Sequence, residues 1–122
     1  NRALSAEETR SALAAALPGP HLAFLRGLSL THEAGDYLFV HAGIRPGRPL
    51  DAQEPADLLW IRSEFLKSRR RHGKIVVHGH SSSHDVVVRR NRICVDTMAY
   101  ATDRLSCVVL EGASRRFLRA EI

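Results

Sequence analysis

The stretch Lys74–Ser81, with the sequence Lys-Ile-Val-Val-His-Gly-His-Ser, constrains the fold more than any other part of the chain. Its β-branched apolar run predicts a short buried strand that ends at His78-Gly79-His80. The same pattern occurs upstream, where the apolar run Tyr37–Val40 leads into His41 and a glycine-containing loop. Two strands that each end in a histidine can place both imidazoles at one edge of a sheet. Such an edge suits a metal or phosphate site.

His41 and His80 are therefore the candidate ligands of a divalent metal ion, which a neutral imidazole binds well. A single histidine in a strand would more often be a core residue, but two at strand-to-loop transitions favour ligation. The pattern is short of ligands, because a hydrolytic metal site usually needs three or more from the protein. We expect His78 to point away from His80 and to support the site rather than bind metal.

Two further residues are candidates for supporting roles. Asp96 follows an apolar strand, so it could accept a hydrogen bond that orients an imidazole, or it could cap a turn by accepting from the next backbone amides. Arg62 directly follows the apolar run Leu58–Ile61 and could hold a phosphate group, whereas the alternative is a surface ion pair. The sequence leaves both pairs of alternatives open.

The composition indicates one folded domain. The 122 residues are 44% hydrophobic and 25% charged, and no apolar run approaches the roughly 20 residues of a spanning helix. No signal-peptide pattern is visible, so we expect a cytoplasmic protein without a membrane partner. Because the first residue is Asn, we expect a processed chain or a piece of a longer one. Cys94 and Cys107 lack paired spacing and are expected to be small buried thiols, with a disulfide between neighbouring strands as the alternative.

The net charge of +5 comes mainly from arginine, which suits two-pronged recognition of carboxylates and phosphates. A basic chain could also bind nucleic acid, but the few aromatic residues are not interleaved with basic ones as a stacking surface requires. We therefore rank a nucleic-acid-binding domain last among the possible functions. Arg69–Arg71 is expected to be the solvated end of a helix rather than a binding patch.

The order of helical and strand patterns predicts a mixed α/β (α+β) domain with a mixed sheet and flanking helices. Helices are expected from the capping box at Ser5 to Leu17, over residues 21–27, and from Pro55 to about Arg70. Strands are expected as a hairpin of residues 28–32 and 37–41, the strand 74–77, and a terminal meander of 86–89, 93–96, 105–110 and 115–120.

Four motifs in this order resemble the C-terminal half of calcineurin-like metallophosphoesterases, and the branch they resemble includes bacterial serine/threonine protein phosphatases and diadenosine tetraphosphatases. The motifs are Leu38–Pro46, Asp57–Arg62, Val76–Ser81 and Asn91–Thr97. The resemblance runs from about Leu17 to the end of the chain.

The resemblance implies the C-terminal half of a four-layer α/β/β/α sandwich that binds two divalent ions, Mn²⁺, Fe or Zn²⁺, at the ends of its strands. It implies hydrolysis of a phosphoester by in-line attack of a metal-bound hydroxide. His41 and His80 match ligands of the second metal, and Arg62 matches the arginine that holds the substrate phosphate. The implied partners are a phosphorylated protein or a dinucleotide polyphosphate, and the N-terminal half of the same domain.

The sequence departs from the family pattern in three places. The motifs Gly-Asp-x-His-Gly, Gly-Asp-x-x-Asp-Arg-Gly and Gly-Asn-His-Glu, which hold the first metal and further ligands, do not occur in these 122 residues. The usual Gly-His-Thr is Gly-His-Ser81, which keeps a hydroxyl. The usual Asp-Thr-Gly-Ala is Asp96-Thr-Met-Ala99, which places the bulky Met98 where a glycine is usual.

From these observations we predict that residues 1–122 are the C-terminal portion of a metallophosphoesterase domain, with serine/threonine phosphoprotein phosphatase as the preferred activity. Diadenosine tetraphosphate hydrolysis is one alternative. Another is a degenerate, non-catalytic module that binds phosphorylated partners, which Met98 suggests. Because the chain supplies two ligands and one arginine, we expect it to have little or no activity by itself.

Overall fold

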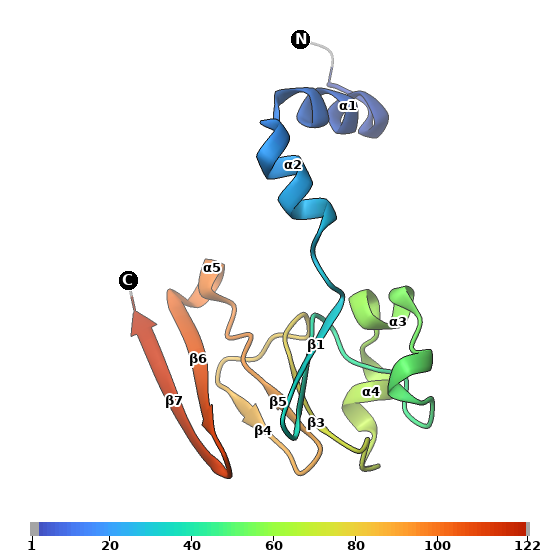
Figure 1. The fold of residues 1–122 in the computed structure, drawn as a ribbon. Coiled ribbons are helices and arrows are strands. Elements are labelled where there is room, and N and C mark those ends of the chain that lie inside the picture. The colour runs from blue at the N-terminus through green and yellow to red at the C-terminus, as the bar shows by residue number, and fades with distance from the viewer. Residues whose placement is uncertain (1–2, 122) are drawn as a thin grey trace.

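The computed structural model describes residues 3–121, which form a mixed α/β fold around one mixed sheet (Figure 1). The sheet has five strands in the order β1-β2-β3-β5-β4, and β6 pairs with β7 in a separate hairpin. The three central strands β2, β3 and β5 are parallel, while β1 and β4 are antiparallel at the two edges. This confirms the predicted fold class. Within residues 3–121 no helix has the length and apolar character needed to cross a membrane.

The strands are β1 Thr31–Ala34, β2 Tyr37–Val40, β3 Ile75–His78, β4 Val87–Val88, β5 Arg92–Cys94, β6 Arg104–Glu111 and β7 Ser114–Glu121. The helices are α1 Ala6–Ala16, α2 Gly19–Arg26, α3 Pro55–Trp60, α4 Ser63–Lys67 and α5 Ala99–Thr102, with a 3₁₀ turn at Leu50–Ala52.

The central strands are covered on both faces, which is why they read as continuous apolar runs. On one face, Leu38 and Val76 belong to a buried cluster with Leu58 of α3 and Phe65 of α4. On the other face, Tyr37, Val77 and Ile93 form a second cluster, against which residues of β6 pack. The result is a layer of short helices, a sheet and a two-stranded hairpin (Figure 1).

The first two helices extend away from the sheet (Figure 1). The predicted capping box is present at α1, where Ser5 and Glu8 exchange side chain to backbone hydrogen bonds of 3.2 and 2.8 Å. Neither α1 nor α2 contains a buried residue. Several large apolar side chains of this part of the chain are exposed: Leu4, Leu13, Phe24, Leu25, Leu28 and Leu30. Helices of this length are only marginally stable by themselves, so the exposed apolar side chains of α1 and α2 leave their main source of stability unfilled within residues 3–121.

The structure corrects three sequence-based expectations. The predicted helix from Pro55 to Arg70 is two short helices, because the chain leaves helical geometry at Ile61 and at Arg62, with φ −131° and ψ −96° at Arg62. The two predicted terminal strand pairs are present, as β4 with β5 and β6 with β7, but they do not form one meander, because β5 pairs with β3 in the five-stranded sheet and the β6–β7 hairpin is separate. Cys107 is exposed rather than buried, and both thiols are free.

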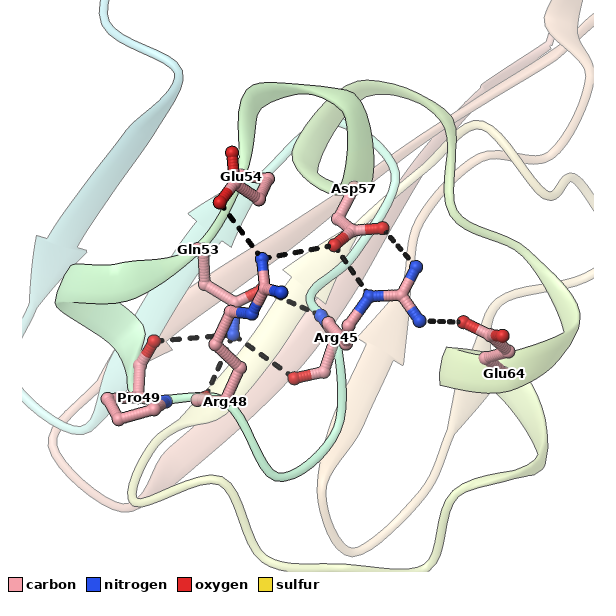
Figure 2. A network of polar contacts seen from close by, with 7 residues as sticks. All are labelled: Arg45, Arg48, Pro49, Gln53, Glu54, Asp57 and Glu64. Carbon is pink, nitrogen blue, oxygen red and sulfur yellow. Dashed lines mark hydrogen bonds and ion pairs between the residues drawn. The ribbon is translucent and has the colours of Figure 1, made fainter.

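A polar network holds the loop after β2 against α3 and α4 (Figure 2). Arg45 donates from Nε and Nη2 to the two carboxylate oxygens of Asp57 in α3, at 2.7 and 2.6 Å. Its third nitrogen pairs with Glu64 in α4. Gln53 closes the loop by accepting from the Arg45 backbone N–H at 2.7 Å and donating to the Arg48 carbonyl at 2.9 Å. One arginine thereby bridges both helices.

We predict that Gly43→Ala strongly destabilises the fold. A Cβ at Gly43, where φ is +151°, would lie 2.3 Å from Cδ1 of Phe65, which has no exposed surface. The combined clash and backbone strain should lower the free energy of unfolding by about 2–4 kcal/mol, measured by urea denaturation. Gly19→Ala is the control, because nothing lies within 4 Å of its Cβ position. Unfolding of both variants at the same urea concentration would contradict the packing described.

We also predict that Asp57 stabilises the fold in a pH-dependent way. Hydrogen bonds from Arg45 hold the pKa of its carboxyl below the ordinary value, against the opposing effect of burial. The unfolded chain therefore takes up this proton more readily, so the contribution is complete at neutral pH and is lost as pH falls below about 4. Asp57→Asn should lower the urea midpoint at pH 7, and the gap to wild type should close in acid.

The exposed carboxylate variant Glu54→Gln is the control for Asp57→Asn, because Glu54 contacts Arg48 only at the surface, at 3.3 Å. A gap between wild type and Asp57→Asn that stays constant from neutral pH into acid would show that the carboxylate charge contributes nothing.

Candidate functional site

His41 and His80 lie together at the carboxyl ends of neighbouring parallel strands. β2 and β3 are parallel and pair with Phe39 opposite Val77, so both strands end at the same edge of the sheet. Beyond the strands, the N–H of Gly79 donates to the carbonyl of His41 at 2.9 Å. The two imidazole rings are 5.0 Å apart between centroids, with an angle of 54° between their planes. The structure thus brings together the two histidines that the sequence singled out.

His80 combines a left-handed backbone with a buried, unpartnered nitrogen. Its φ is +62°, a strained value for a residue with a side chain. Within residues 3–121, its Nε2 is buried without a hydrogen-bond partner. The ring meets Trp60 edge-on at 5.7 Å. A buried polar atom left without a partner is costly, and it is typical of a position that a ligand completes.

The surroundings of His80 favour the neutral form of its ring. Burial lowers the pKa of His80, and the charges of Arg62 and His41 act in the same direction, while the Trp60 backbone and Asp96 oppose them. A neutral imidazole has the free lone pair that metal ligation requires.

Arg62 stands at the break between α3 and α4, beside the histidine loop. Its Nη1 donates to the His80 carbonyl at 3.1 Å and approaches the Ser81 hydroxyl at 3.4 Å. In the described part of the chain it has no carboxylate partner, so the alternative of a surface ion pair is not what the structure shows. The exposed guanidinium keeps donors free for an incoming anion.

Asp96 takes the turn-capping position that was one of its two alternatives. Its Oδ1 accepts from the Met98 backbone N–H at 3.1 Å. A Cβ at Gly79 would lie 3.2 Å from the Asp96 Cβ, so the glycine permits the close approach of the two loops. That Asp96 orients an imidazole stays a prediction, because within residues 3–121 neither His41 nor His80 donates a hydrogen bond to its carboxylate.

His78 is buried and hydrogen-bonded inside the fold. Its Nδ1 faces the Gly79 carbonyl at 3.0 Å, and because a carbonyl only accepts, Nδ1 carries the proton. Nε2 is then the acceptor that Arg92 approaches at 3.5 Å. Burial lowers the pKa of His78 to about 4. The separation from His80 does not come from strand alternation, since residues two apart share a face; the backbone turns at His80.

Met98 occupies a backbone conformation that suits glycine. Its φ and ψ are 55° and 50°, in the left-handed helical region, and it begins α5 directly after the Asp96 turn. This explains in physical terms why a glycine is favoured at the position and why methionine carries backbone strain there.

The residues fit a metal ion only in part. Within residues 3–121 no group of three or more histidine, cysteine, aspartate or glutamate side chains is placed to hold a metal. His41 and His80 can supply two imidazole ligands, and the remaining ligands would have to come from elsewhere. The two histidines open onto a mostly apolar groove of about 740 Å³ that extends to Leu25 and Leu30.

Sequence reasoning missed Trp60 as a neighbour of the site. It belongs to the apolar run Leu58–Ile61 of the expected helix, but it is 70% exposed and lies against the His80 ring. Helical periodicity could not reveal this, because the helix ends at Trp60 itself.

Comparison with known proteins identifies the fold. No protein-family model and no curated protein matches the sequence. A solved crystal structure described as that of "a putative diadenosine tetraphosphatase" matches with a TM-score of 0.68 and 21% identity over 89% of this chain. The match spans 59% of that protein's length. At this level of identity the likeness establishes a shared fold and no more.

We predict that Met98→Gly relieves strain at the site. A residue with a Cβ pays about 1 kcal/mol in the left-handed region, so Met98→Gly should be more stable than Met98→Ala by about that amount. At ordinary positions the order is reversed, since glycine loses more entropy on folding. Thermal or urea unfolding of the two variants measures the difference. An alanine variant at least as stable as the glycine variant would show that the backbone is unstrained at position 98.

Proposed function

We propose that this chain contributes to metal-dependent hydrolysis of phosphoesters, as the C-terminal portion of a metallophosphoesterase domain. The observation that carries the proposal is the pairing of His41 and His80 at one sheet edge, with the buried Nε2 of His80 lacking a partner. Arg62 beside them provides a guanidinium for a phosphate group. The solved structure with the same fold is described as that of "a putative diadenosine tetraphosphatase", which supports a phosphoesterase-type function.

In this proposal His41 and His80 hold one divalent ion, Mn²⁺, Fe or Zn²⁺, as neutral imidazoles. Such an ion supplies the charge that activates water and neutralises phosphoryl oxygens. Arg62 binds and orients the phosphate by donating from the guanidinium edge that does not contact the His80 loop. Trp60 limits the access of water to His80 from one side, and Asp96 fixes the turn that brings the third strand end to this edge.

The remaining ligands would come from the N-terminal half of the domain. The exposed apolar residues of α1 and α2 and the apolar groove in front of the histidines support this, because they offer surface for further polypeptide to cover. The ion that His41 and His80 bind would then lie between the two halves.

Two substrate classes compete within this proposal. A phosphorylated serine or threonine of a protein is the class that the motifs favour. A dinucleotide polyphosphate is the alternative, and the name of the solved structure with the same fold favours it. Arg62 can bind a terminal or bridging phosphate in either case, so the assay must contain both.

A non-catalytic module that binds phosphorylated partners is the second candidate function. The observation in its favour is Met98, a bulky and strained residue next to Asp96. It predicts phosphate binding that depends on Arg62 without turnover.

The test is hydrolysis by the protein as its source makes it, in Mn²⁺, of a phosphoserine peptide and of diadenosine tetraphosphate. His80→Gly removes the imidazole without adding strain at φ +62°, and should lower kcat by about 100-fold or more. His84→Ala, which removes an exposed imidazole elsewhere, should leave kcat unchanged. Arg62→Gln should raise KM for whichever substrate is used.

Turnover that survives His80→Gly at the wild-type rate would refute the ligand assignment. Saturable binding of the phosphopeptide that is lost in Arg62→Gln, with no hydrolysis of either substrate, would establish the non-catalytic module instead.

A further inference from the structure

A second concave site lies at the opposite end of the parallel strands from His41 and His80. It is a pocket of about 650 Å³ between the segment that follows α4 and the turn that joins β4 to β5. Six of its nine lining residues are basic: Lys67, Arg69, Arg71, Arg89, Arg90 and Arg92. The other three are Leu66, Ser68 and Asn91, so no carboxylate lines the pocket. Six positive charges therefore gather in one hollow, although the net charge of the whole chain is +5.

The two walls of this basic pocket are held together by a buried amide. Asn91 donates from Nδ2 to the carbonyls of Ser68 and Arg70, at 2.9 Å each. The backbone carbonyl of Asn91 accepts a hydrogen bond from the backbone N–H of Val76 at 3.1 Å, which connects the pocket to β3. The segment expected to be a solvated helix end is thus a non-helical wall fixed to the sheet. This arrangement makes the pocket a built feature of the fold.

Arg92 is the buried cation of the pocket lining, and within residues 3–121 it has no anionic partner. It is only 8% exposed, and its contacts are to the His78 ring at 3.5 Å and the Leu66 carbonyl at 3.4 Å. Burial lowers the pKa of Arg92, and the charge of Arg89 acts in the same direction. Buried guanidinium groups are normally paired with an acid. An anion in the pocket would supply the missing charge.

The other five cations of the pocket are exposed to solvent, and they too lack a carboxylate partner within residues 3–121. Elsewhere in residues 3–121, several arginines form ion pairs with carboxylates, as Arg45 does with Asp57 and Arg119 with Asp85. None of the six pocket cations forms an ion pair with a carboxylate of the described chain. Like charges held close together repel, so this distribution costs stability unless an anion binds.

We propose that this basic pocket binds a small, multiply phosphorylated anion, an oligophosphate chain, through the arginine side chains that line it. Guanidinium groups bind phosphate oxygens two at a time, and several of them can hold successive phosphates of one chain. A volume of about 650 Å³ is of the size that small-molecule pockets have. Leu66 is the one large apolar side chain in the lining, so the phosphates rather than a ring provide the recognition.

The features of the pocket favour an oligophosphate over a nucleic acid. Single-stranded nucleic acid is bound by grooves in which aromatic side chains stack on the bases, and this pocket contains no aromatic residue.

The pocket is independent of the proposed hydrolytic site. His41 and His80 follow the carboxyl ends of β2 and β3, while Arg92 begins β5 and the pocket lies at the amino ends of these strands. An oligophosphate could therefore bind here whether or not the histidines hold a metal.

The test is calorimetric titration of the chain with sodium tripolyphosphate in metal-free buffer, with orthophosphate and a single-stranded oligonucleotide as the other titrants. We expect one tripolyphosphate per chain and much weaker binding of orthophosphate. Arg89→Gln/Arg90→Gln, in which both residues are exposed, should weaken tripolyphosphate binding by about tenfold or more. The control Arg26→Gln/Arg116→Gln removes the same charge from exposed positions outside the pocket and should change affinity by less than about twofold.

Arg62→Gln separates this pocket from the histidine site and should leave tripolyphosphate binding unchanged. The proposal is overturned if tripolyphosphate does not bind, if the control double variant weakens binding as much as Arg89→Gln/Arg90→Gln, or if Arg62→Gln abolishes binding. It is also overturned if the oligonucleotide binds more tightly than tripolyphosphate and depends on the same two arginines, which would make the pocket a nucleic-acid site.

Discussion

The parallel pairing of β2 with β3 is the constraint on which the candidate site depends. The register sets where both strands end, and the hydrogen bond from Gly79 to the His41 carbonyl, at 2.9 Å, carries the pairing beyond the strands. The distance between the two imidazoles is therefore determined by the backbone rather than by the side chains of flexible loops. A shift of one residue would move His80 along the sheet edge relative to His41 by about 3.3 Å, the rise of one residue in a strand.

Local patterns were sufficient to predict the parts of the site that lie on strands. Apolar runs that end in histidine predicted that His41 and His80 would meet, and the Ser5 capping box predicted the start of α1. Patterns failed where a distant contact decides the conformation. The helix expected across Ile61 and Arg62 breaks, and Arg45, from a loop far back in the sequence, holds the two pieces through Asp57 and Glu64 (Figure 2). That break is what presents Arg62 to the histidine loop.

The arginines of this chain divide into two groups that composition alone could not separate. Some form ion pairs with acids within the fold, as Arg45 does, and are therefore not available to bind another anion. Those around Arg92 meet no acid in the described chain, and Asn91 holds the segments that carry them together. The local sequence of Arg69–Arg71 is typical of a helix end. The conformation of this segment instead depends on hydrogen bonds from Asn91, which lies about 20 residues later in the sequence. The sheet consequently presents positive groups at both ends of its parallel strands.

We propose that His41 and His80 bind one divalent ion together. Titration of the isotope-labelled chain with Mn²⁺, followed by NMR of the imidazole resonances, is the decisive experiment, because paramagnetic broadening reports even weak binding near an assigned side chain. We expect the signals of His41 and His80 to broaden together at low Mn²⁺, while those of His21 and His84 stay sharp. Broadening that spares His41 and His80, or that affects all four histidines alike, would contradict it.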